Sequence, residues 1–124
     1  AGLVMVGSAR YTKLDPKVPA MFSAPIVTDL LRGDLGYEGV VITDDVNAKA
    51  VQATPAAQRA VKVVDAGGDI VLTGDASVAS SMIKALAAKA ADDPAFADKV
   101  QASVQRVVTL KERMGLLPCS TTTP

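Results

Sequence analysis

The chain has 124 residues, which suits one domain and is too short for two ordinary ones. Its 13 basic residues balance 13 acidic ones and only 3% of residues are aromatic, so it offers neither a positive field nor a stacking surface for nucleic acid. It contains no run of about eighteen apolar residues, and we therefore expect no membrane-spanning segment.

Cysteine content also limits the possible chemistry. Cys119 is the only cysteine, and it lies in a polar C-terminal tail at 118–124 that follows a single folded unit at 1–117. One cysteine excludes an intrachain disulfide, and no spacing typical of metal ligands occurs, so we expect neither a metal nor a cofactor. The chain enters an apolar run directly after Ala1 and Gly2, which suggests a piece of a longer protein.

The first predicted strand is the continuous apolar run 3–7, which is typical of a strand buried on both faces. A loop follows and leads to a predicted helix that Ser23 caps and Pro25 opens. Gly33 and Gly36 end this helix.

The second predicted strand is the β-branched run 40–43. Thr54 is expected to cap the next helix, which Pro55 opens and the pair Gly67-Gly68 ends. The third predicted strand, at 70–73, follows at once. A third helix then carries an apolar stripe at Val78, Met82 and Leu86, and a fourth runs from Asp93-Pro94 to Gly115.

Apolar strands that alternate with amphipathic helices indicate right-handed crossovers and a parallel α/β sheet. Three strands alone would leave both edges of the sheet open. A (β/α)8 TIM-type barrel needs eight strands and roughly 200 residues or more. We therefore predict that this chain forms the last three βα units of such a barrel plus a C-terminal helix.

The carboxylate pair Asp44-Asp45 directly follows the second strand. Functional sites of parallel α/β folds lie at the carboxyl ends of the strands, and two carboxylates after buried residues are costly without donors or water. Consecutive residues point to opposite faces, so one of the two can face a barrel mouth squarely. From spacing alone, turn formation and catalysis both stay open for the pair, and helix capping is favoured for Asp75.

The segment around this pair resembles the signature of glycoside hydrolase family 3. The matching residues are Gly36-Tyr37-Glu38-Gly39, the apolar strand 40–42, Thr43, and then Asp44-Asp45-Val46. Three further segments are similar to the family in the same order, namely Val4 to Gly7, Leu14 to Ser23, and Asp65 to Leu72. The resemblance covers 1–117 and is strongest to the bacterial β-N-acetylglucosaminidase branch.

This resemblance implies a retaining exo-β-N-acetylglucosaminidase that removes terminal N-acetylglucosamine from cell-wall-type glycans. Asp44 would be the nucleophile that forms a covalent glycosyl-enzyme. In that branch a His on a loop in the first half of the barrel is the acid/base. This chain contains no His, so its partners are expected to be the missing N-terminal part of the barrel and a carbohydrate substrate, and the chain alone should be inactive.

Two departures from the family pattern lie near the expected sugar pocket. Relatives commonly carry His where Ser8 stands, and Ser-Met where Asn47-Ala48 stand. Ser8 and Asn47 are therefore candidate substrate-binding residues, with ordinary loop polarity as the alternative. Asp45 is expected to be structural and to organise the loop through backbone N–H groups. The resemblance also suggests an exported lipoprotein of the cell envelope, with a cytoplasmic location as the alternative.

Two other classes of function remain to be weighed. A phosphoacceptor receiver domain also ends a strand in paired aspartates that hold Mg²⁺, but it carries them after its first strand and needs a Lys after a later one. Thr73-Gly74 occupies the matching place here. The second alternative is a non-catalytic relative that has kept the fold as a binding or scaffold element.

Overall fold

The computed structural model describes residues 1–118 of the chain. The polar tail beyond Pro118, with Cys119, lies outside the described residues. In chain order the elements are β1 (Leu3–Val6), η1 (Ala20–Phe22), η2 (Pro25–Asp34), β2 (Val40–Thr43), η3 (Lys49–Val51), α1 (Ala56–Asp65), η4 (Ala76–Val78), α2 (Ala79–Asp92) and α3 (Pro94–Arg113). Of these, η2 is wound as a π-helix, and η1, η3 and η4 are short 3-10 turns. No helix within 1–118 combines the length and the apolar character needed to cross a membrane.

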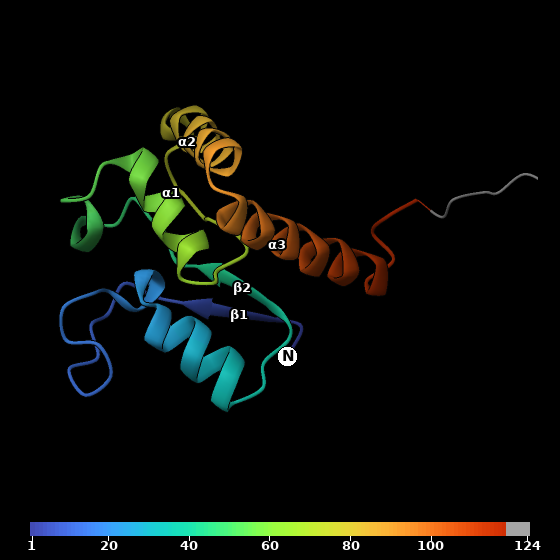
Figure 1. Ribbon diagram of the computed structural model, residues 1–124, viewed down its shortest axis with the longest axis horizontal. Coiled ribbons are helices and arrows are strands. Elements are labelled where there is room, and N and C mark those ends of the chain that lie inside the picture. Colours follow the sequence, from blue (N-terminus) through green and yellow to red (C-terminus); the bar gives the residue numbers. More distant parts are fainter. Residues whose placement is uncertain (119–124) are drawn as a thin grey trace, which may run out of the picture.

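The first two predicted strands are confirmed, and they pair in parallel. Leu3 lies opposite Val40 and Val6 lies opposite Thr43. Figure 1 shows the two arrows pointing toward the same side of the molecule, where the long loops after them lie. The connection between them, 7–39, carries η2, as a βαβ crossover requires.

The third predicted strand is only partly formed, so three complete βα units are not confirmed. The segment 70–73 makes one parallel bridge, between Ile42 and Ile70. Beyond it, Leu72 N–H donates to the Thr43 side-chain Oγ1 at 3.0 Å, where a regular ladder would use a main-chain carbonyl. Leu72 C=O then accepts from Val46 N–H at 2.9 Å. In a regular ladder the donor to Leu72 C=O would be the N–H of Asp45. The chain after β2 therefore contains one extra residue at this point, as in a β-bulge.

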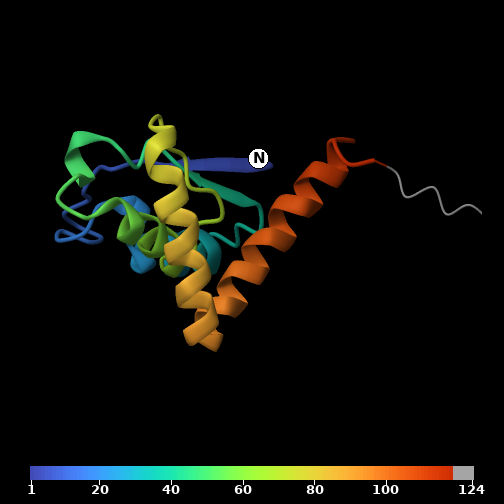
Figure 2. The same cartoon turned by 90° about the horizontal axis from the view of Figure 1, so that it is seen from above.

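One face of this sheet lacks cover at β1 within the described residues. Leu3 and Met5, on the same face of β1, are 43% and 56% exposed, although Val40 of β2, which pairs with Leu3, is 1% exposed. Val41 and Thr43, on the opposite face of β2, are each 1% exposed. In Figure 2 most of the helical chain lies on one side of β1. The bare face is apolar, as are the inward-facing layers of a parallel barrel.

A second apolar surface lies between the last two helices. In Figure 2, α2 and α3 diverge from the turn at Asp93. A hollow of about 550 Å³ between them and the segment 70–73 is lined mainly by aliphatic side chains. Ile83 and Val104, which line it, are 65% and 57% exposed.

The core lies on the helix-covered side of β2. Its buried members are Met21, Val46, Val51, Ala60, Val63 and Met82. These residues come from η1, the loop after β2, η3, α1 and α2, so the core joins elements on both sides of the Asp44-Asp45 pair along the chain. With aromatics so scarce, close packing of aliphatic side chains supplies most of the buried area.

Two predicted helix caps are wrong, because each residue is drawn into a different contact. Ser23 Oγ donates to Asp15 Oδ2 at 2.7 Å, and Ala24 occupies the N-cap position of η2 without a side-chain cap bond. Pro55, not Thr54, is the N-cap of α1. The main-chain carbonyl of Thr54 instead accepts from Arg59 Nε at 2.8 Å.

Two aspartates do cap helices as their positions predicted. Asp75 accepts from Ser77 N–H at 2.9 Å at the start of η4, which leads directly into α2. Asp93 accepts from Phe96 N–H at 3.2 Å at the start of α3. After α1 the chain reverses at Gly67 with φ of 101°, a conformation that favours glycine.

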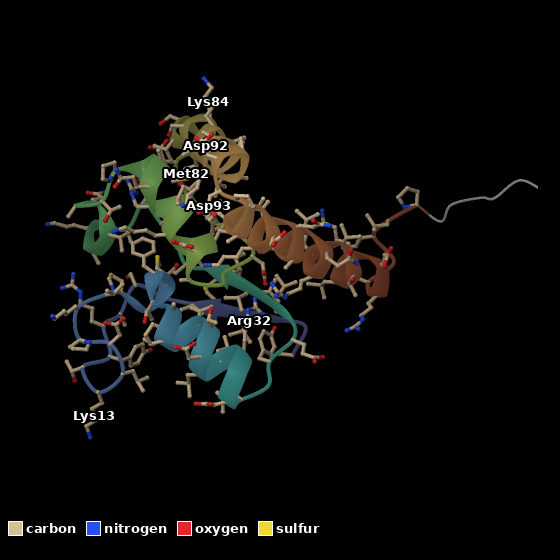
Figure 3. The ribbon with its side chains drawn as sticks, in the orientation of Figure 1. Lys13, Arg32, Met82, Lys84, Asp92 and Asp93 are labelled. Atoms are coloured by element: carbon tan, nitrogen blue, oxygen red, sulfur yellow. The ribbon has the colours of Figure 1, made fainter. Side chains whose placement is uncertain are left out.

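A fully buried carboxylate at the other end of the sheet ties three elements together. Asp69 Oδ2 accepts from Arg32 Nη2 at 2.7 Å and from Val41 N–H at 2.8 Å, and Asp69 Oδ1 accepts from Arg106 Nη1 at 2.7 Å. The Asp69 side chain has no exposed surface. Arg32 also donates to the Gly39 carbonyl at 3.1 Å, and Figure 3 shows it between η2 and the strands. This one carboxylate thereby links η2, β2 and α3.

Asp69→Ala should lower the free energy of unfolding by about 3 kcal/mol or more, since it leaves the Val41 N–H and two guanidinium groups without their buried partner. The matched control is Asp65→Ala, which removes the exposed ion pair with Lys99 and should cost at most about 1 kcal/mol. Urea denaturation of both variants checks this. Equal losses in the two variants would contradict the central role of Asp69.

Candidate functional site

The structure brings the predicted site residues to one edge of the sheet. The pairing of Val6 with Thr43 places the residues after β1 and after β2 side by side. Asp44 N–H donates to the Val6 carbonyl at 3.0 Å. Gly74, at the end of the third segment, donates its N–H to Asp45 Oδ1 at 3.1 Å. Three chain segments therefore meet around the aspartate pair.

Asp44 is exposed and lies directly after the last residue of β2. Its backbone is held to β1 through the Val6 carbonyl. Within residues 1–118, the one hydrogen bond to its carboxylate comes from the N–H of Asp45, at 2.8 Å to Oδ1. The side chain is thus anchored at its base, and its outer oxygen is open to a ligand.

Asp45 turns the other way and is half-buried. Its Oδ1 accepts from Asn47 N–H at 2.8 Å and from Gly74 N–H at 3.1 Å. The Asn47 N–H, then that of Gly74, and more weakly the Arg59 charge, hold the pKa of the Asp45 carboxyl below its ordinary value. A Cβ on Gly74 would lie 3.1 Å from Asp45 Oδ2, so glycine permits this close approach. The carboxylate joins the loop after β2 to the loop after 70–73.

Arg59 is a buried residue of this region that the sequence reasoning missed. It is 6% exposed, and from α1 its Nε donates to the Thr54 carbonyl at 2.8 Å. Its Nη1 donates to the Val46 carbonyl and, at 3.1 Å, to Asn47 Oδ1. The sequence did contain one indication that Arg59 is buried. It lies four residues before Val63 and therefore on the buried face of α1. A charged residue there needs acceptors, and the loop after β2 supplies them.

Ser8 follows β1 at the same edge and is half-buried. The carbonyls on either side of it, of Gly7 and Ala9, accept from Met21 N–H at 3.1 Å and Ala20 N–H at 2.8 Å, which fixes this turn against η1. No hydrogen bond within residues 1–118 joins Ser8 to Asp44 or Asn47. Ser8 therefore shares the edge but not the hydrogen-bond network.

The site offers an accessible carboxylate, that of Asp44, without an adjacent acid among the described residues. A catalytic acid must stay protonated near neutral pH, which requires a raised pKa. Asp45 is held below its ordinary pKa by backbone N–H groups, and the Ser77 hydroxyl and N–H lower that of Asp75. Neither carboxyl suits that role. The arrangement can supply a carboxylate that attacks an electrophilic carbon.

Comparison with known proteins gives a consistent family. The model of the Glycosyl hydrolase family 3 N terminal domain matches residues 1–110. A β-N-acetylhexosaminidase from Beutenbergia cavernae superimposes with a TM-score of 0.87 at 46% identity, over 90% of this chain and 34% of that one. A glycoside hydrolase family 3 β-N-acetylglucosaminidase from Paenibacillus sp. has a TM-score of 0.86 at 29% identity, over 99% of this chain and 24% of its own.

Curated relatives point the same way. A β-hexosaminidase from Alkalilimnicola ehrlichii is 43% identical over 70 residues, which are 56% of this chain and 20% of that protein. The chain thus spans between about a fifth and a third of the relatives named here.

The lowered pKa of Asp45 predicts a pH dependence of its loop. A depressed folded pKa means that the ionised carboxylate stabilises the loop above its ordinary pKa of 3.8, and that this contribution is lost as pH falls below that value. In an NMR titration, the amides of Asn47 and Gly74 should shift with a midpoint below 3.8. Asp45→Asn should abolish the shift, and Asp29→Asn, at an exposed position on η2, should not. A midpoint at or above 3.8 would contradict the assignment.

Proposed function

The chain belongs to glycosyl hydrolase family 3, and on that premise we propose that the full protein is a retaining exo-β-N-acetylglucosaminidase with Asp44 as its nucleophile. The family's N-terminal domain has a TIM-barrel-type α/β fold. In such folds the catalytic residues lie at the carboxyl ends of the strands. The observation that carries the proposal is the exposed carboxylate of Asp44 at that end of β2.

The names of the relatives support the proposed substrate class. They are described as a β-hexosaminidase, a β-N-acetylhexosaminidase and a β-N-acetylglucosaminidase. We therefore propose a terminal β-linked N-acetylglucosamine as the sugar that is cleaved. Cell-wall-type glycans as its source are what the resemblance to the bacterial β-N-acetylglucosaminidase branch implies.

The reaction would proceed in two steps. First, an Asp44 carboxylate oxygen bonds to the anomeric carbon while the bond from that carbon to the glycosidic oxygen breaks, and the leaving oxygen takes a proton from a general acid. Second, a water loses a proton to the same group, now a base, and its oxygen replaces Asp44 on the anomeric carbon. Two displacements return the original configuration, and Asp44 is released as a carboxylate.

The structure supports this role for Asp44 in two ways. Its N–H is bonded to Val6, and its Oδ1 accepts from Asp45 N–H, so its position is fixed without a neighbouring side chain covering the carboxylate. The side chain is also exposed, so the carboxylate is open to a ligand. Asp45, which accepts from Asn47 and Gly74, would act as a structural residue that holds the loop behind the nucleophile.

The general acid would come from another part of the protein. The chain has no His, and Asp45 and Asp75 both have lowered pKa values. In a retaining glycosidase the acid must lie about 5 Å from the nucleophile, across the sugar. The missing first part of the barrel would provide it, as the resemblance to the β-N-acetylglucosaminidase branch implies.

In the full-length protein, Asp44→Ala should lower kcat on an aryl β-N-acetylglucosaminide by at least about 1,000-fold, because no group replaces the nucleophile. The melting temperature should change little, since the side chain is exposed. Asp45→Ala is the matched control. It should lower the melting temperature, because two backbone N–H groups lose their acceptor.

A 2-deoxy-2-fluoro sugar that traps the glycosyl-enzyme gives a direct measurement, followed by peptide mapping. Label on Asp44 is the expected result. Label on Asp45, or on no residue of this chain, would overturn the assignment of the nucleophile. Absence of turnover in the full-length protein would favour a non-catalytic relative that keeps the fold.

The 124-residue chain alone should not hydrolyse the same substrate at an enzyme-like rate. A positioned general acid typically contributes about 10²–10⁴-fold, and the described residues supply none beside Asp44. Initial rates of the chain and of its Asp44→Ala variant, each compared with the buffer blank, provide the measurement. Turnover by the chain that survives Asp44→Ala would place the chemistry elsewhere.

A further inference from the structure

The contact between Arg59 and Asn47 fixes which way the Asn47 carboxamide faces. A guanidinium group has only donors, so the atom of Asn47 that it contacts must be the acceptor, Oδ1. That contact is 3.1 Å long, and Arg59 is itself only 6% exposed. The Asn47 side-chain NH₂ group therefore points away from α1.

This NH₂ group has no protein acceptor among the described residues, whereas the other polar groups of Asn47 do have partners. The Asn47 N–H donates to Asp45 Oδ1 at 2.8 Å, and its carbonyl accepts from Gln52 Nε2 at 2.9 Å. No buried side-chain nitrogen or oxygen within residues 1–118 lacks a hydrogen-bond partner. The NH₂ group of Asn47 is therefore accessible to solvent.

The orientation is held from several directions. Arg59 also donates to the carbonyls of Val46 and Thr54, so its guanidinium bonds to the loop before and after Asn47. Val46 is fully buried, which fixes the residue directly before Asn47 in the core. If the Asn47 carboxamide were flipped, its NH₂ group would face the guanidinium of Arg59. Both groups are donors, so the hydrogen bond would be lost.

We propose that Arg59 orients Asn47 as a hydrogen-bond donor to the substrate, toward an acceptor oxygen on the sugar bound at Asp44. The inference rests on the proposed function and deepens it. Asn47 lies three residues after the nucleophile, on the loop that Asp45 and Arg59 hold in place. The acceptor is a ring hydroxyl oxygen or the carbonyl oxygen of the acetamido group. Arg59 is a positioning residue, because it acts through Asn47.

Asn47→Asp in the full-length protein tests the donor function of the side chain separately from its acceptor function. The carboxylate keeps an acceptor for Arg59 but no longer has a donor for the sugar. Loss of one neutral hydrogen bond should lower kcat/KM by about 3- to 10-fold, while the melting temperature stays the same or rises. Lys84→Gln is the surface control, since Figure 3 shows Lys84 pointing outward from α2, and its kcat/KM should equal that of the wild type.

A new carboxylate near Asp44 could also act by raising the pKa of the nucleophile, and the pH profile distinguishes the two causes. A lost donor lowers kcat/KM on the plateau at higher pH as well. Complete recovery at higher pH would overturn the proposal.

Arg59→Lys tests the positioning. An ammonium group cannot bond to all three acceptors, so Asn47 is released and kcat/KM falls. Because both variants act through one hydrogen bond, their effects in the double variant Arg59→Lys/Asn47→Asp should be less than additive. Strictly additive losses would contradict the coupling.

Two substrates identify the acceptor. If Asn47 donates to the acetamido carbonyl, Asn47→Asp lowers kcat/KM on an aryl β-N-acetylglucosaminide and leaves the aryl β-glucoside unchanged. If it donates to a ring hydroxyl, both fall equally. If the wild type hydrolyses the N-acetylglucosaminide and the Asn47→Asp variant is equally active, this inference alone is rejected. If the wild type is inactive, the proposed function is rejected.

Discussion

The rest of the fold depends on the hydrogen bonds and ion pairs that the buried carboxylate of Asp69 accepts. It accepts from the N–H of Val41 in β2, from Arg32 of η2 and from Arg106 of α3, with no surface of its own exposed. A buried charge is tolerated only when paired and hydrogen-bonded, and here the two guanidinium groups and one N–H meet that demand. Because Asp69 begins the segment beside β2, the same contacts align that segment with the strand.

The opposite end of the sheet is organised differently. There the ladder is interrupted after Ile70, and side chains accept two of the main-chain N–H groups: Thr43 Oγ1 accepts from Leu72 N–H, and Asp45 Oδ1 accepts from Gly74 N–H. The interruption lets consecutive residues leave the strand toward different surroundings. Asp45 turns inward to the loop backbone, and Asp44 remains exposed at the edge. β-Bulges near functional sites commonly redirect side chains in this way.

The described chain has two apolar surfaces that water would contact, the face of β1 that carries Leu3 and Met5 and the hollow between α2 and α3. The hollow adjoins the helix-covered core, since Ala60 and Met82 belong to both. Under the proposed function, the two surfaces accord with a site in which Asp44 is the nucleophile and Asn47 a donor to the sugar, while the described residues supply no acid. Exposed apolar patches are typical of surfaces that contact other polypeptide, and under the proposed function that polypeptide would also supply the general acid.

The sequence by itself determined the features that depend on local pattern. Its apolar runs located β1 and β2, its glycines and aspartates located the helix ends at Gly67, Asp75 and Asp93, and its motifs indicated the family and the candidate nucleophile. Tertiary structure decided whatever depends on partners distant in the chain. Arg32 and Asp69 are 37 residues apart, and Thr43 Oγ1 meets Leu72 N–H 29 residues later. The sequence therefore could not show that 70–73 would pair through a side chain, or that Ser23 would bond to Asp15 instead of capping η2. It also could not show that Arg59 would be buried against the loop after β2, because the acceptors that stabilise a buried polar group are set by the packing of the whole chain.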